Sequence, residues 1–295
     1  MKKTLKRTSG KAAGWYLVLL VAAAIASGLA ARGEVLGGDS APTLVARAVS
    51  ETPSLDPEAA LWGRMPAVEV PLSGQQIVIP RGGGSIRSLQ VRAAHDGKSL
   101  FLHLKWRDPT RDERSLAAEQ FTDAVAVQFP EKSVTFAQLC MGTLAYYLNI
   151  WQWRADRQAD QHRSPRDIER QYPGMHWDYY PFGAGNRTFA PGRAAGNVLS
   201  LPPARTPVQA LIAGGAGSLT ARPPEEQAVA GMGVWRDGYW QVVLSRALQS
   251  SAPHDVRFAP GKATVIALAV WDGSRKERGS EKAVANWLRF ALRER

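Results

Sequence analysis

Two Asp-Gly dipeptides, each set between runs of alternating apolar and polar residues, constrain this chain more than any other feature. The first separates residues 86–94 from residues 99–106, and the second lies within residues 231–248, where Trp235 and Trp240 flank the turn. Such a pair between alternating runs is typical of a β-hairpin, because Asp and Gly both tolerate the positive φ angles of a tight turn. We therefore expect two antiparallel hairpins.

The rest of the chain outside its N-terminus adds further strands and few helices. Residues 121–129 alternate like a half-buried strand, residues 263–271 read as a buried strand, and residues 285–292 as a closing one. Convincing 3.6-residue periodicity is rare, so we predict a mainly β fold over residues 61–295. The expected architecture is an antiparallel β-sandwich with long irregular loops and a few short helices. Residues 155–227, rich in Arg, Pro and Gly, are expected to form a long loop insertion over one end.

The N-terminus has the pattern of an export signal. Residues 12–31 contain no charge and follow five basic residues with no acid among them: Lys2, Lys3, Lys6, Arg7 and Lys11. A basic stretch before an apolar run is typical of a secretory signal, and the Ala-rich end of the run favours cleavage. A run of about 20 residues is also long enough for an uncleaved membrane anchor, which stays open as the alternative. We assign residues 1–32 to this signal or anchor and residues 33–60 to a linker or arm.

Composition excludes several classes of site. Cys140 is the single cysteine, so the chain cannot form an internal disulfide, a Cys-rich zinc site, an iron–sulfur cluster or a thioether-attached haem. The formal net charge is +11, but the basic residues form no recognisable nucleic-acid motif, and we expect no nucleic-acid partner. The sequence contains no GxSxG, HExxH or P-loop, so common hydrolase chemistry is not indicated.

Aromatic and histidine residues offer the remaining candidates. Trp151 and Trp153 alternate in an extended segment and must share one face. They could fill the core, form a flat wall for a cofactor, or form a sugar-stacking platform. His103 lies in a predicted strand, where a hydrogen-bonded structural histidine is favoured. His176 lies in an aromatic loop and is the best free-standing ligand candidate.

Several segments in a fixed order resemble those of a known family, the haem b-binding γ subunits of the type II dimethyl sulfoxide reductase group. That group includes ethylbenzene dehydrogenase, dimethylsulfide dehydrogenase, selenate reductase and chlorate reductase. The resemblance is spread over about residues 60–293. It is carried by FTDAVAVQFP (121–130), CMGTLAYYLNIWQWRAD (140–156), RAAGNVLS (193–200), GVWRDGYWQVVLSRAL (233–248) and AVWDGSRKERGSEKAVANW (269–287).

The resemblance implies one non-covalent haem b held by a β-sandwich. In the family a methionine of an MG motif and a lysine between WDG and the last Trp are the axial ligands, and these carry over to Met141 and Lys282. Lys276 is the other lysine in that segment and the alternative ligand. Cys140 and the Met175–His176 pair are further possible ligands. Trp151 and Trp153 are the candidates for contact with the cofactor.

The resemblance also implies a role and partners. Family γ subunits act beside a molybdopterin catalytic subunit and an iron–sulfur subunit, and exchange electrons with a periplasmic c-type cytochrome or similar carrier. The chain is therefore expected to be a periplasmic electron-transfer subunit that is not itself catalytic, with a possible membrane tether through residues 12–31. The alternatives are an exported carbohydrate- or ligand-binding sandwich, or a structural subunit without haem.

Overall fold

The computed structural model describes most of the chain after the N-terminal segment. The described residues are 43–115, 117–132, 141–143, 146–161, 174, 204 and 206–294. The expected signal or anchor (1–32), Cys140, the Met175–His176 pair and much of the 155–227 insertion lie outside them. Among the described residues, no helix has the length and apolar character needed to cross a membrane.

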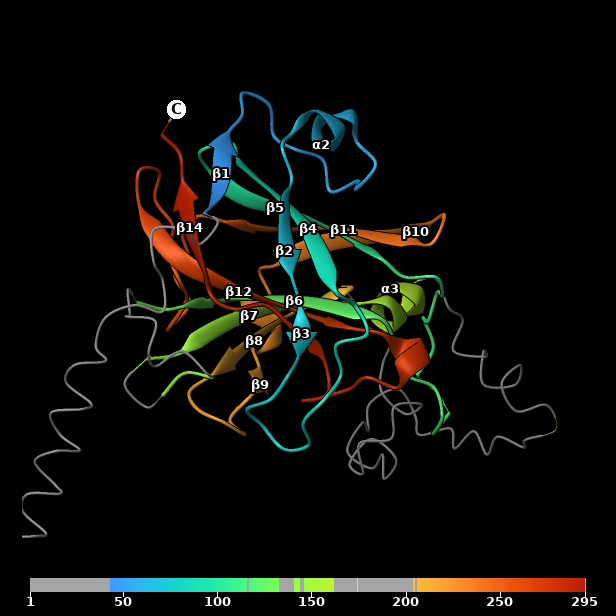
Figure 1. Cartoon of the computed structure of the whole chain (residues 1–295). Helices are drawn as coiled ribbons and strands as arrows, with labels where there is room; N and C mark the ends of the chain where they lie inside the picture. Colours follow the sequence, from blue (N-terminus) through green and yellow to red (C-terminus); the bar gives the residue numbers. More distant parts are fainter. Residues whose placement is uncertain are drawn as a thin grey trace, which may run out of the picture. The chain divides into compact units, whose positions relative to one another are not determined.

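Fourteen strands are joined by hydrogen bonds into one branched sheet. The predominance of strands confirms the mainly β prediction (Figure 1). One layer comprises β1 (Leu44–Ala48), β2 (Val68–Pro71), β4 (Ser88–His95), β5 (Ser99–Arg107), β10 (Ala230–Arg236), β11 (Tyr239–Ala247) and β14 (Leu288–Leu292). The other comprises β3 (Ser73–Gly74), β6 (Ala124–Pro130), β7 (Leu148–Arg154), β8 (Val208–Ala213), β9 (Thr220–Ala221) and β13 (Ala283–Val284). β12 (Ala263–Trp271) joins the layers, because its first half pairs with β14 and its second half with β6. The helical elements are short: α2 (Ala60–Arg64), α3 (Ala155–Asp160), η3 (Pro224–Glu226) and η4 (Gly273–Arg275).

Both predicted hairpins form at their Asp-Gly turns. β4 and β5 pair antiparallel, and the Asp96 Oδ1 accepts hydrogen bonds from the backbone N–H groups of Lys98 (2.8 Å) and Ser99 (2.7 Å). β10 and β11 pair in register across a turn in which Asp237 and Gly238 have φ angles of 53° and 76°. Two successive positive φ angles characterise the type I′ turn that suits the twist of a hairpin.

A cluster of aromatic rings fills the space between the layers. Trp106 and Trp240, from the first layer, contact Trp153 from the second, with ring centroids 6.4 and 4.8 Å from it. Gly233 of β10 leaves the room that Trp153 needs, because a Cβ there would lie 2.3 Å from the indole ring. Side chains of this size remove large apolar areas from water and stabilise the sandwich.

The sheet is more extensive than the sequence indicated. β1 falls within residues 33–60, which composition assigned to a linker, yet it lies between β4 and β14 and is parallel to both. The strands that pair with β1 are distant from it in sequence, so no hairpin pattern predicts it. Residues 155–227 likewise contain α3 and β8, and β8 pairs with β7 along six residues. The antiparallel prediction therefore holds for every described strand pair except the two that β1 makes.

His103 is a buried structural residue of β5, as its place in a strand suggested. It stacks on Trp62 with ring centroids 5.2 Å apart, and its Nε2 donates to the carbonyl oxygen of Pro57 at 3.1 Å. Burial, reinforced by the positive charge of Arg92, lowers the pKa of His103 from 6.5 to about 4. The folded state therefore favours the neutral ring.

This depressed pKa predicts an acid-dependent loss of stability. The unfolded chain binds a proton at His103 below about pH 6.5, whereas the folded chain does so only near pH 4. Stability contributed by the neutral ring is complete above pH 6.5 and falls as the pH drops toward 4, by up to about 3 kcal/mol. Urea unfolding of His103→Gln between pH 7 and 4 should therefore show a shallower decline than wild type. His254→Gln, at an exposed imidazole, is the control and should follow the wild-type curve; equal slopes for all three proteins would contradict the prediction.

Candidate functional site

An apolar cluster lies on the face of the second layer that points away from the aromatic core. Its buried members are Ala124, Ala126, Ile150, Leu211, Ala213 and Trp271, with Ala269 partly buried beside them. The strand register sets Ala126 opposite Ala269 and Ala124 opposite Trp271. We call this cluster the alanine floor. Small side chains in register produce a flat surface that a flat, apolar molecule can contact closely.

Met141 packs against one end of the alanine floor. Its carbonyl oxygen accepts a hydrogen bond from the backbone N–H of Gly215 at 3.0 Å. The next residue, Gly142, has a φ of 80°, and a Cβ there would lie 2.8 Å from the carbonyl oxygen of Ala213. Only glycine fits that position. The Met-Gly pair therefore fixes the methionine beside the Ala213 end of the floor.

Lys282 lies at the other end, where its Nζ is 5.0 Å from the centroid of the Trp271 ring. Its backbone is held between two distant segments. Its N–H donates to the carbonyl oxygen of Gly82 at 3.2 Å, and its carbonyl oxygen accepts from Gln75 at 3.1 Å. Gly83 packs directly on it, because a Cβ there would lie 2.2 Å from the Lys282 nitrogen.

The register shows how the thioether and the amine are related. Across the sheet, Ala213 lies at the same position along the strands as Pro130, which is the last residue of β6. Trp271 pairs with Ala124, which is the first residue of β6. The two donors therefore approach a single uncharged floor from opposite ends. The structure thus brings a thioether and an amine, two possible metal donors, to one apolar cluster.

The structure does not bring Trp151 and Trp153 to this floor. They share one face, as alternation requires, but that face points into the core, where their exposed fractions are 1% and 0%. The guanidinium of Arg246 lies over Trp151, 5.0 Å from its centroid. Ile150 and Gln152 face the other side instead. Alternation shows which residues of a strand share a face, but not which of the two faces points into the core. Because both rings are buried, they also form no sugar-stacking surface.

Lys276, the alternative lysine, points into solvent. Its Nζ forms an ion pair of 2.6 Å with the exposed carboxylate of Glu119. Its backbone has a φ of 61° at the end of η4. The structure thus places Lys282, and not Lys276, beside the floor. The other possible ligands, Cys140 and His176, lie outside the described residues.

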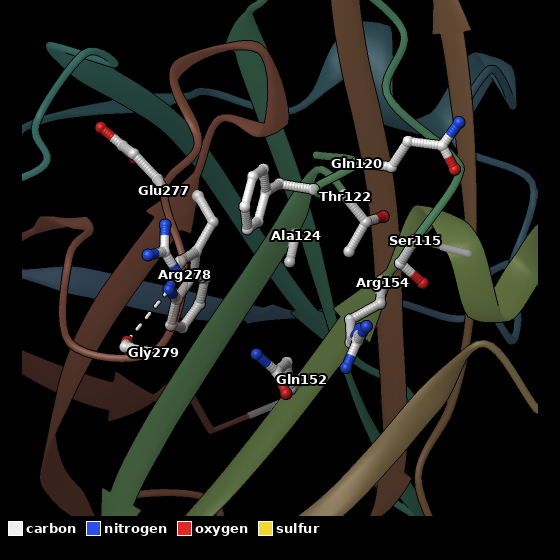
Figure 2. Close-up of a pocket in the computed structure, with 11 residues that line it drawn as sticks. Ser115, Gln120, Thr122, Ala124, Gln152, Arg154, Glu277, Arg278 and Gly279 are labelled. Atoms are coloured by element: carbon white, nitrogen blue, oxygen red, sulfur yellow. Dashed lines mark hydrogen bonds between the residues drawn. The ribbon is translucent and has the colours of Figure 1, made fainter. Parts of the chain in front are cut away.

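A cavity of about 150 Å³ opens at the Trp271 end of the floor (Figure 2). Its lining comprises Ser115, Gln120, Phe121, Thr122, Ala124, Gln152, Arg154, Trp271, Glu277, Arg278 and Gly279. Arg154 is ion-paired with Asp156 at 2.6 Å, and the guanidinium of Arg278 lies 4.8 Å from the Phe121 ring centroid. These cations give the cavity a rim that suits carboxylate groups. The sequence did not identify these arginines as candidates, although Arg154 lies on the same face of its strand as Ile150 and Gln152.

The donor set and the floor fit a haem, which is a flat apolar ring bearing two carboxylates. The thioether and amine are metal donors, the floor is uncharged, and the arginines lie at its edge. The cavity is smaller than the 300–1,000 Å³ typical of pockets for drug-sized ligands. The described residues therefore outline one end of such a site.

Comparison with known proteins gives relatives that match most of this chain. The chain is 29% identical over 243 residues to the "Putative respiratory nitrate reductase heme subunit ORF7" of Haloferax mediterranei, covering 82% of this chain and 70% of that protein. It is 29% identical to the dimethylsulfide dehydrogenase subunit gamma of Rhodovulum sulfidophilum (79% and 73% covered). It is 27% identical to the chlorate reductase subunit gamma of Ideonella dechloratans (79% of each covered).

One solved structure and one family model complete the comparison. A family 9 carbohydrate binding module from Caldicellulosiruptor kristjanssonii in complex with glucose matches with a TM-score of 0.42 and 8% identity, covering 86% of this chain and 97% of that one. The family model described as ethylbenzene dehydrogenase matches residues 59–283, which is most of the chain, and confirms the resemblance noted in the sequence. The chain belongs to the ethylbenzene dehydrogenase family.

Proposed function

We propose that this chain is a periplasmic electron-transfer subunit that binds one haem b without a covalent link, with Met141 and Lys282 as the axial ligands of the iron. The observation that carries the proposal is that the thioether of Met141 and the amine of Lys282 contact the same apolar cluster. Family membership supports it, as do the relatives whose names describe a haem subunit of a nitrate reductase and gamma subunits of two other oxidoreductases.

When bound, the haem would supply one-electron oxidation and reduction, and Met141 and Lys282 are the residues that would hold its iron. The chain's own residues set the conditions. The neutral thioether of Met141 favours the reduced, less charged iron and so raises the potential. Lys282 can donate only as the free amine, so ligation requires release of its proton.

The proposed partners are a molybdopterin catalytic subunit, an iron–sulfur subunit and a periplasmic c-type cytochrome as the electron carrier. The relatives named as gamma subunits support an assembly of several chains. Without the five basic residues that precede the apolar segment, the chain has a formal charge of +6, which suits docking to an acidic partner. Export through residues 1–32, with residues 12–31 as the apolar segment, would deliver the chain to the periplasm.

Haem reconstitution tests the proposal. Purified full-length protein titrated with haemin should acquire the absorption bands of a six-coordinate b-type haem. Met141→Ala and Lys282→Ala should each lose that spectrum, because one axial position would then lack its protein donor. Lys276→Ala, at the exposed lysine of the same segment, is the matched control and should bind haem like wild type.

Two results would overturn the assignment. A wild-type protein that is folded but binds no haem would make the chain a structural subunit without cofactor. A six-coordinate spectrum retained in Lys282→Ala and lost in Lys276→Ala would transfer the ligand role to Lys276.

A further inference from the structure

Three buried aspartates meet where the two layers join. Asp108 directly follows β5, Asp123 directly precedes β6, and Asp272 directly follows β12. Their exposed fractions are 0%, 0% and 4%. Each contributes a carboxylate oxygen, and these oxygens all lie within 4.8 Å of one another. Such close, buried negative charges need a counter-charge.

Backbone and hydroxyl groups satisfy only part of this cluster. The Asp123 oxygens accept from the N–H of Gly273 (2.9 Å) and from the Trp240 indole (2.9 Å). The Asp272 Oδ1 accepts from the Ser274 hydroxyl at 2.6 Å. In contrast, the Oδ2 of Asp108 is buried without any hydrogen-bond partner. A buried carboxylate oxygen without a donor is costly, and its presence within an acidic cluster points to a missing positive group.

No basic side chain among the described residues supplies that charge. The ion pairs of the described chain involve none of these three aspartates. The negative charge of Asp112 also acts on Asp108. The backbone N–H of Asp112 donates to Asp123 at 2.7 Å, and its Oδ2 is also buried without a partner. Burial and mutual repulsion raise the pKa of Asp108 to about 6 and that of Asp123 to about 8. Either protons or a cation must neutralise the group.

We propose that Asp108, Asp123 and Asp272 bind a calcium ion. Calcium takes oxygen ligands at 2.3–2.6 Å in flexible geometry, so oxygens that share one ion lie up to about 5 Å apart. This agrees with the spacing in the cluster, which offers no nitrogen or sulfur ligand. The ion would tie the end of β5 in one layer to β6 and β12 in the other. It would also fix the start of the segment that runs from Asp272 to Lys282.

Terbium luminescence tests the site directly. Tb³⁺ takes the same hard oxygen ligands as Ca²⁺ and emits when a nearby indole is excited. Trp240 donates to Asp123, and the Trp235 indole donates to the carbonyl oxygen of Asp108 at 3.0 Å. Full-length protein should therefore sensitise Tb³⁺ with one ion per chain, and added Ca²⁺ should quench the signal. Asp108→Asn and Asp272→Asn should weaken binding at least about tenfold, whereas Asp237→Asn, at an exposed turn, should leave it unchanged.

The melting temperature of the wild-type protein gives a second test that does not depend on the folding of any variant. The melting temperature of wild-type protein should rise when Ca²⁺ replaces EGTA at neutral pH. If the melting temperature does not rise with Ca²⁺ and no sensitised Tb³⁺ emission appears, the proposal is overturned. If the melting temperature is insensitive to the chelator and rises toward acid pH, protons neutralise the three aspartates instead. Neither readout requires haem, so the outcome is independent of the function proposed above.

Discussion

Gly83→Ala should weaken haem binding more than tenfold and destabilise the fold. A Cβ at Gly83 would lie 2.2, 2.6 and 2.7 Å from three backbone atoms of Lys282, which are far below contact distance. Backbone cannot rotate aside as a side chain can, so either the glycine loop or the segment bearing Lys282 must move. The amine would then leave its place over Trp271, and overpacking of this kind adds about 1–3 kcal/mol of destabilisation.

Gly82→Ala is the matched control for that effect. Gly82 also has a positive φ, of 126°, but a Cβ there meets nothing within 4 Å. Both variants carry the cost of a positive φ in a residue with a Cβ, about 1–3 kcal/mol. Only Gly83→Ala also displaces Lys282. Haem titration and urea unfolding of the two variants should therefore separate the clash from the backbone strain, and equal haem affinities would show that the position of Lys282 does not matter.

The hairpins could be predicted because their information is local. Asp237 and Gly238 specify a turn through their own tolerance of positive φ, and the flanking runs specify the register. β1 could not be predicted in this way. It is short, and its parallel partners, β4 and β14, are reached only after long stretches of chain. Pairing of that kind depends on tertiary contacts that a single segment does not encode.

The candidate site was accessible from the sequence only in part. Met141 and Lys282 followed from the family resemblance, and the structure places both beside one floor. The contacts that hold Lys282, from Gln75 and the glycines at 82 and 83, come from about two hundred residues away and leave no local signal. The three buried aspartates are likewise isolated in sequence and meet only at strand ends.

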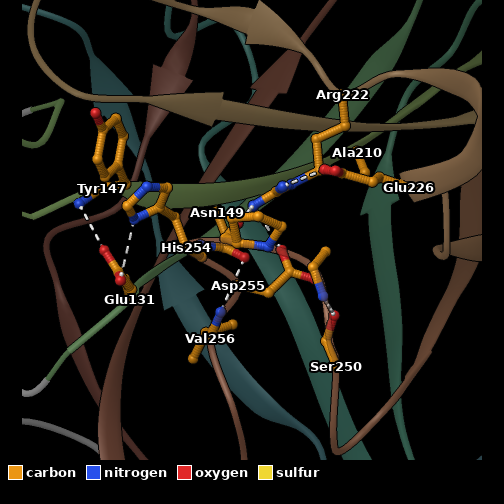
Figure 3. A network of polar contacts seen from close by, with 12 residues as sticks. Glu131, Tyr147, Asn149, Ala210, Arg222, Glu226, Ser250, His254, Asp255 and Val256 are labelled. Atoms are coloured by element: carbon orange, nitrogen blue, oxygen red, sulfur yellow. Dashed lines mark hydrogen bonds and ion pairs between the residues drawn. The ribbon is translucent and has the colours of Figure 1, made fainter.

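Asp255→Ala should cost about 3–5 kcal/mol of folding stability. Asp255 is buried, and its Oδ1 lies 2.7 Å from the buried Arg222 (Figure 3). Its Oδ2 lies 3.4 Å from Arg246, which is also buried. Ser250 also donates to it, at 2.6 Å. Burial lowers the pKa of Arg246 to about 10, while the charge of Asp255 opposes that effect. Removing the carboxylate would leave both guanidiniums charged at neutral pH without their shared partner.

Glu226→Ala is the control, since it removes a different partner of the same arginine. Glu226 contacts Arg222 at 2.7 Å, but its side chain is 26% exposed, so water can replace it. An ion pair of that kind contributes roughly 0–1 kcal/mol. Chemical denaturation should give the full loss for Asp255→Ala and little change for Glu226→Ala, with melting temperatures differing by roughly 10 °C.

The size of the Asp255 effect also reports on the core around Trp151. Arg246 lies over Trp151 and Phe258, and its guanidinium donates to the carbonyl oxygen of Val256. If it keeps that position without Asp255, a buried cation remains over the rings and the penalty is large. A loss below about 1 kcal/mol would mean that Arg246 swings out to water. The second layer would then keep its stability without the carboxylate, and the network would not be needed to hold Trp151 in the core.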